Sequence, residues 1–132
     1  MFIGIIVILG AGVAVLMVFV VKSFIAPQKI AGIDKLISNG KYGPAIKAAK
    51  AIIARNPRDT EARYLLGKAY LADGKAELAL MEFKTVNATA IFSKTIPEAE
   101  FRKTIAQLFL KYNQPDEALK EFLLLIKLEP FQ

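Results

Sequence analysis

The 132-residue sequence contains no cysteine and no histidine, and these two absences narrow the chemistry that is open to it. Without thiols or imidazoles there is no cysteine nucleophile, no disulfide, no imidazole base and no ligand set typical of zinc or haem. Neither a G-x-G-x-x-G nor a G-x-x-x-x-G-K-[ST] phosphate-binding motif occurs. We therefore predict a protein that is not an enzyme, that holds no metal and that needs no cofactor.

Charged and polar side chains are missing from residues 1–21, which form one uninterrupted apolar run. As an α-helix, a run of this length reaches about 30 Å, the thickness of the membrane hydrocarbon core. A cleaved signal peptide is the alternative, but the segment lacks a basic start and a small-residue cleavage site. We expect residues 1–22 to be a retained transmembrane anchor. Gly10 and Ala14 are the small residues at which two such helices would pack.

Positive charge is concentrated directly after the apolar run. Residues 22–58 hold eight basic side chains against the single acid Asp34, a net charge of +7, whereas residues 59–132 sum to −1. Positive flanks of membrane helices stay in the cytoplasm, and basic segments are attracted to anionic lipid. We expect a single-pass protein of the inner (cytoplasmic) membrane with a cytoplasmic soluble domain. A periplasmic domain is the alternative.

The remaining residues show helical periodicity interrupted by turn signals. Asp59 is placed to cap one helix, Pro115 to open another, and Thr95 with Glu98 resembles a further capped start. Five extra residues lie within 87–96, as a longer helix or a longer loop. The expected helices span about 28–38, 44–55, 59–72, 75–88, 95–112 and 115–128.

Small, aromatic and turn positions recur at offsets of 34 and 39 residues, which pair Gly40 with Gly74 and Gly67 with Ala106. The runs that recur are Leu66-Gly67-x-x-Tyr70 with Ala79-x-x-x-Phe83, and Ile105-Ala106-x-x-Phe109 with Ala118-x-x-x-Phe122. These runs resemble tetratricopeptide repeats (TPR). A more degenerate copy precedes them, so the repeats span about 26–59, 60–93 and 99–132. An unrelated six-helix bundle is the alternative.

The resemblance is incomplete at positions that the family usually fills. Its tryptophan is replaced in the three copies by Lys29, Arg63 and Arg102, and Ile91 stands where the middle copy would have its closing proline. Even so, the resemblance implies an all-α fold, in which an N-terminal transmembrane helix is followed by a short α-solenoid of three TPR-like helix pairs. The solenoid would occupy residues 23–132.

In this family the first helices of the pairs line a concave groove that takes a peptide or a helix. The resemblance places the partner groove at Ile30, Asp34, Ile37, Tyr64, Lys68, Leu71, Lys103, Gln107 and Leu110. The family's carboxylate-clamping residues are not carried over, because Ile30 and Asp34 stand in their places.

The last helix is apolar nearly all round, although a terminal solenoid helix should have a polar outer face. We therefore predict a C-terminal contact face at Leu119, Leu123 and Ile126 that docks on another protein or subunit. The alternative is that the chain is a fragment of a longer repeat array.

An anchor followed by repeats also resembles the lipopolysaccharide-assembly protein B type of bacterial envelope protein. That type has a metal-binding cysteine-pair domain that is missing here, so only its adaptor architecture is transferred. We predict a membrane-anchored adaptor or scaffold whose partners are a protein and membrane lipid, with oligomerisation open and no nucleic acid. The alternative is a structural subunit of a motility, secretion or envelope-assembly complex.

Overall fold

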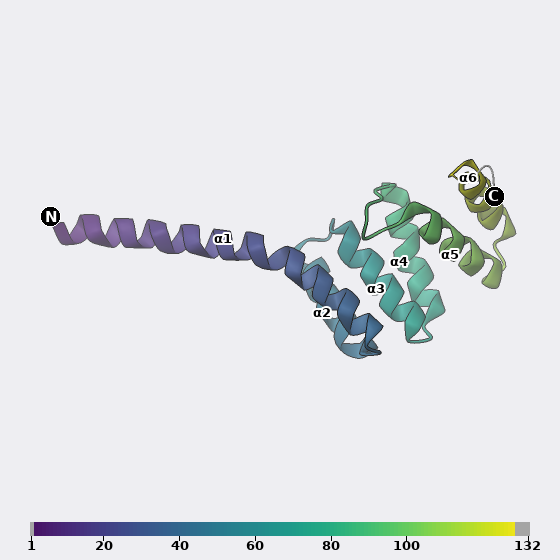
Figure 1. Ribbon diagram of the computed structural model, residues 1–132, viewed down its shortest axis with the longest axis horizontal. Helices are drawn as coiled ribbons and strands as arrows, with labels where there is room; N and C mark the ends of the chain where they lie inside the picture. Colours follow the sequence, from purple (N-terminus) through teal and green to yellow (C-terminus); the bar gives the residue numbers. More distant parts are fainter. Residues whose placement is uncertain (1, 129–132) are drawn as a thin grey trace. The chain divides into compact units, whose positions relative to one another are not determined.

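The structure, a computed structural model, describes the backbone of residues 2–128 and the side chains of 3–19 and 29–128. The helices are α1 (Phe2–Ser38), α2 (Tyr42–Arg55), α3 (Thr60–Ala72), α4 (Ala76–Thr89), α5 (Glu98–Lys111) and α6 (Pro115–Leu128). This part of the chain is all-α, and after α2 the helices form two antiparallel TPR-like pairs, α3 with α4 and α5 with α6 (Figure 1). Pro130 and the end of the predicted third repeat lie outside the described residues.

The chain divides into two compact units, Met1–Gly32 and Ile33–Gln132. In the first unit, α1 exposes its large apolar side chains, among them Ile3, Ile8 and Phe19. No helix in the described part of the chain is both long enough and apolar enough to cross a membrane. The predicted anchor continues through residues 20–22, whose side chains lie outside the described residues.

Helix α1 differs from the expectation of a separate helix that begins near Gln28. It continues without interruption from Phe2 through Pro27 to Ser38, so that its final turns belong to the second unit. Proline lacks one backbone donor and disfavours a helix interior, but it does not always end the helix. The sequence-based boundary at this position was wrong.

Apart from the start of α5, the other helix boundaries agree with the sequence to within about two residues, because the turn chemistry that predicted them is present. Three turns repeat one geometry with positive φ, at Gly40 (76°), Gly74 (80°) and Asn113 (59°). In each turn the next residue donates its N–H to a carbonyl near the helix end, as Lys75 does to Tyr70 at 2.8 Å. Asp59 caps α3 by accepting the N–H of Ala62 at 3.0 Å, as predicted.

The core of the second unit lies between helices that pack through small residues. Ala79, Ala106 and Ala118, the small residues of the recurring runs, are buried, at 0–1% exposed. Gly67 is required for another reason: a Cβ built on it would lie 2.5 Å from the Phe83 ring. Helices α3 and α4 approach so closely here that only glycine fits without displacing that ring.

The extra residues between the second and third pairs form a longer loop, residues 90–97. Ala90, with φ 51°, ends α4, and Ser93 and Ile96 exchange backbone hydrogen bonds at 3.1 and 3.2 Å. Ile96 is completely buried and ties the loop to the core. The predicted cap from Thr95 and Glu98 was wrong: Pro97 occupies the N-cap position and makes no side-chain cap bond. The Glu98 carboxylate is drawn to Arg102 instead, at 2.9 Å.

Candidate functional site

A cavity of about 250 Å³ opens among the end of α1 and helices α3, α4 and α5. Four predicted groove residues line it, namely Ile37, Tyr64, Lys68 and Leu71. The other lining residues were not predicted as groove residues; they are Ala72, Phe83, Glu100, Phe101 and Thr104. Helices from successive repeats therefore contribute to one surface, as the solenoid arrangement implied.

The cavity has an apolar aromatic base and a mixed polar rim. Tyr64, Phe83 and Phe101 are nearly inaccessible, and their ring centroids lie 5.8–6.2 Å apart in tilted and edge-to-face contacts. Aromatic contacts of this kind form rigid apolar surfaces. Leu71 and Glu100 are exposed at the rim, beside the half-buried Lys68. A partner could therefore place an apolar side chain on the base and polar groups at the rim.

The charged side chains around the cavity lie close to Tyr64. Lys68 Nζ lies 3.4 Å from Asp34 Oδ1 and 5.6 Å from the centroid of the Tyr64 ring. Burial, together with the nearby negative charges of Glu100 and Asp34, raises the pKa of Tyr64 to about 12. The phenol therefore stays protonated at neutral pH and keeps a hydroxyl that can donate a hydrogen bond.

The remaining predicted groove residues do not line this cavity. Lys103, Gln107 and Leu110 are exposed on α5, whereas the lining residues of α5 belong to the flank that carries Glu100, Phe101 and Thr104. Asp34 takes part only through its ion pair with Lys68. Ile30 is half-buried and belongs to the first unit. The offset of 39 residues identified equivalent positions on α5 but did not show which of its flanks borders the cavity.

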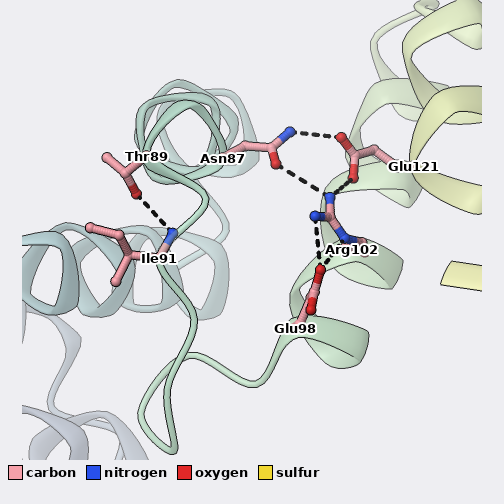
Figure 2. Close-up of polar contacts among 6 residues, drawn as sticks. All are labelled: Asn87, Thr89, Ile91, Glu98, Arg102 and Glu121. Carbon is pink, nitrogen blue, oxygen red and sulfur yellow. Dashed lines mark hydrogen bonds and ion pairs between the residues drawn. The ribbon is translucent and has the colours of Figure 1, made fainter. Parts of the chain in front are cut away.

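A buried polar cluster between α4, α5 and α6 was not predicted from the sequence. Arg102 pairs with Glu121 at 2.8 Å and with Glu98 at 2.9 Å, while Asn87 donates its amide N–H to Glu121 at 2.7 Å (Figure 2). Arg102 and Glu121 are only 8% and 5% exposed. The Arg102 guanidinium also lies 5.1 Å from the Phe92 ring centroid.

The cluster is a structural device. No side-chain nitrogen or oxygen buried in the described part of the chain lacks a hydrogen-bond partner, so Arg102 and Glu121 satisfy each other. The same arrangement recurs in the preceding pair, where Arg63 contacts Glu82 at 3.2 Å, again 19 residues apart. The signal was present in the sequence: an arginine replaces the family's tryptophan in both copies, and an acid follows it at a constant spacing.

The predicted C-terminal contact face is open to solvent. Leu119, Leu123 and Ile126 are 57%, 52% and 61% exposed, because α6 packs on α5 through Ala118 and Glu121. Gly10 and Ala14 of the predicted anchor contact are also exposed. Contiguous exposed apolar side chains often mark an interaction surface.

Comparison with known proteins supports the repeat in part of the chain. The profile of the family described as tetratricopeptide repeat matches residues 32–84, which lie within the first two predicted repeats. No curated protein sequence matches the chain.

Two solved structures have a similar fold. One is MamA, residues 41 to the end, from Desulfovibrio magneticus RS-1, with 22% identity, a TM-score of 0.61, and coverage of 79% of this chain and 56% of that one. The other is described as the MamA RS-1 ArsTM double mutant, with 21% identity, a TM-score of 0.61, and coverage of 80% and 58%. The chain thus spans little more than half the length of these two structures, and at such identities the likeness concerns the fold alone.

Proposed function

We propose that this tetratricopeptide repeat protein is a membrane-anchored adaptor that binds a protein segment in the groove between α3 and α5. The observation that carries the proposal is the cavity itself, which combines an aromatic base with a polar rim. Adaptors of this kind recognise a partner by seating apolar side chains in a preformed groove, without chemistry. Tyr64 and Phe101 would form the seat, and Lys68 and Glu100 would set the polar contacts.

The occupant that fits best is a helix or extended peptide with one bulky apolar side chain. A cavity of about 250 Å³ is large enough for a single such side chain and too small for most cofactors. The base needs no rearrangement, since Phe83 and Phe101 are already locked in place by their edge-to-face contact at 5.8 Å. A preformed site of this kind lowers the ordering cost of binding.

The membrane part of the proposal is supported by the sequence of residues 1–21, which carries no charged or polar side chain. The described side chains of this run are exposed, as expected for a surface that needs an apolar solvent. We place the protein in the inner membrane, with the repeats on the cytoplasmic side because of the +7 charge of residues 22–58. Periplasmic repeats are the alternative that a reporter fused to the C-terminus would reveal.

A structural subunit of an envelope complex is the second candidate function, and the exposed leucines of α6 favour it. Leu119, Leu123 and Ile126 would then form a permanent contact with a neighbouring subunit, and the groove would be secondary. Obligate contacts are more apolar than transient ones, which suits this face better than the groove.

Site-specific photo-crosslinking of the full chain in its native membrane separates the two functions. A crosslinking residue at Leu71 or Thr104 reports on the cavity, and one at Leu123 reports on the α6 face. Leu78, on α4, is exposed to a degree similar to Leu71 and serves as the matched control. We expect one protein adduct from Leu71 and Thr104 that Lys68→Glu weakens at least about tenfold, because it places a second acid beside Asp34.

The outcomes are distinct. An adduct that forms only from Leu123, in fixed stoichiometry, would establish the structural role and reject the groove. Equal adducts from Leu71 and Leu78 would show that neither is a specific site.

A further inference from the structure

The outer face of α2 differs from every other exposed helix face of the second unit in its charge. Its exposed residues are Gly43, Pro44, Lys47, Lys50, Ala51, Ala54 and Arg55. Three of them are cations, the rest are small, and α2 contains no acidic residue. The face is therefore cationic and free of bulky apolar side chains.

The positive charge of this region is not neutralised within the described residues. Lys35, Lys41 and Arg58 of the same basic segment are also exposed, and neither they nor the cations of α2 take part in an ion pair in the described part of the chain. Asp34, the single acid in residues 22–58, is engaged by Lys68. Lys50 lies 5.8 Å from the Tyr70 ring centroid, a contact that leaves its charge uncompensated.

The outer faces of the other two second helices carry both signs of charge. On α4, Glu77 and Lys84 are both exposed, and on α6 Lys120 pairs with Glu117 at 3.2 Å. Mixed surfaces of this kind are ordinary solvated faces. The cationic face is thus a property of α2 alone, and not of the repeat.

We propose that the outer face of α2, defined by Lys47, Lys50 and Arg55, binds the anionic headgroups of the membrane leaflet beside the apolar segment 1–21. The inference rests on the proposed anchor, because the apolar run ends one residue before the basic segment begins and so brings it to a lipid surface. Basic residues close to an anionic leaflet each strengthen binding by roughly fivefold.

Lipid suits this face better than nucleic acid or an acidic protein. The exposed residues of α2 include no aromatic side chain on which a base could stack. They also include no large apolar anchor of the kind that protein interfaces use. Small residues between the cations, such as Ala51 and Ala54, let the helix lie close to a flat charged plane.

The absence of cysteine makes a direct measurement simple. Ala51→Cys in the full chain provides a single labelling site for a fluorophore, and Thr85→Cys on α4 provides a control position. The labelled chains are reconstituted in vesicles of phosphatidylcholine, with or without one-third phosphatidylglycerol, that contain a headgroup quencher. We expect quenching at position 51 to rise at least about fivefold with phosphatidylglycerol and to reverse in high salt, with no such change at position 85.

Matched charge reversals identify the residues responsible. Lys47→Glu, Lys50→Glu and Arg55→Glu together should abolish the quenching, whereas Lys84→Glu, Lys120→Glu and Lys127→Glu, which change the net charge equally, should preserve it. The milder Lys47→Gln with Lys50→Gln should reduce it partially, and circular dichroism checks that each variant is folded. Equal quenching with and without phosphatidylglycerol, or equal loss in both triple variants, would overturn the proposal.

Flotation with vesicles tests the proposed anchor separately from the α2 surface. An anchored chain floats with phosphatidylcholine vesicles in high salt, whatever happens at position 51. A chain that leaves neutral vesicles but still shows the salt-sensitive signal on anionic ones would reject the anchor and retain the α2 surface. A duplex oligonucleotide that binds the chain more tightly than anionic vesicles do, through the same three residues, would overturn the lipid assignment.

Discussion

The second helix pair (α3 and α4) and the third (α5 and α6) contain the same inter-helix ion pair in different surroundings. Arg63 contacts Glu82 at 3.2 Å in the second pair, and Arg102 contacts Glu121 at 2.8 Å in the third. The residues correspond at the 39-residue offset. Yet the first two side chains are 24% and 21% exposed, and the last two only 9% and 7%.

The loop that precedes α5 is one origin of this difference. Phe92 of that loop lies over the Arg102 guanidinium at 5.1 Å, and Asn87, near the end of α4, donates to Glu121 at 2.7 Å. Arg63 instead uses its spare donors on the carbonyl of Pro57, at 3.1 and 3.2 Å. The repeat spacing determines which charges meet, and the neighbouring segments determine how deeply the pair is buried.

The burial of the equivalent phenylalanines differs in the opposite direction from the burial of the ion pairs. Phe83 is fully buried in the second pair, whereas its equivalent Phe122 in the third is only half-buried. The second pair has a neighbour on each side and needs Gly67 against Phe83; the third accepts Ala106 at the corresponding position. Among the ion pairs of the described residues, the most deeply buried one thus lies in the third pair, where Phe122 is only half-buried.

Removing one acid from each pair tests this comparison with the largest expected effect. Glu121→Ala should destabilise the second unit by about 3–5 kcal/mol, because it leaves the Arg102 charge buried and partly unpaired. Glu82→Ala should cost about 1 kcal/mol or less, since water can reach Arg63. Urea denaturation of the full chain in mild detergent, followed by circular dichroism, measures both. Equal losses would show that burial of the pair has no energetic consequence.

Tyr64, whose ring contacts Phe101 of the third pair, should make the second unit less stable at alkaline pH. Tyr64 has a raised pKa of about 12, so above pH 10 the unfolded chain loses the phenol proton that the folded chain keeps. Its contribution is complete below pH 10 and is lost as the pH rises to 12, by about 2–3 kcal/mol at most. Tyr64→Phe should remove this component from the pH dependence of the unfolding free energy. An unchanged alkaline limb in the variant would contradict the assignment.

Exchanging the small residues of the two pairs should have the smallest effect. Gly67→Ala should destabilise by about 1–3 kcal/mol, because the new methyl group forces the Phe83 ring to move. Ala106→Gly should cost about 1 kcal/mol through backbone entropy alone. The urea midpoints of the two variants provide the comparison. A stabilising Gly67→Ala would show that the ring yields freely and that the close approach of α3 and α4 is not required.

Much of the second unit was predictable because its signals are local. The turns at Gly40, Gly74 and Asn113 follow from residues that tolerate positive φ, and the cap at Asp59 from its own carboxylate. The separate helix near Gln28 and the cap at Thr95 were wrong. Helix α1 continues through Pro27, and α5 begins only at Glu98, with Pro97 at its N-cap position. Both predictions rested on a few neighbouring residues, whereas the ends of these helices depend on more than that local pattern.

Only the part of the candidate site on α1 and α3 was predicted from the sequence. Ile37, Tyr64, Lys68 and Leu71 line the cavity, but the contribution of α5 comes from Glu100, Phe101 and Thr104 rather than from the expected positions. An offset in sequence identifies equivalent residues, whereas the border of a cavity depends on how two helices are rotated about their axes. That rotation is set by packing over several turns and by the inserted loop.

Most helix boundaries, the repeat, the apolar run of residues 1–21 and the concentration of positive charge follow from residue type and from spacing along the chain. The tertiary structure alone decided the burial of Arg102 and Glu121, the need for Gly67 and the orientation of the α2 cations. These depend on contacts between residues far apart in the chain. The constant spacing in the sequence matches Arg102 with Glu121, but how deeply the pair is buried depends on segments that reach it only when the helices pack.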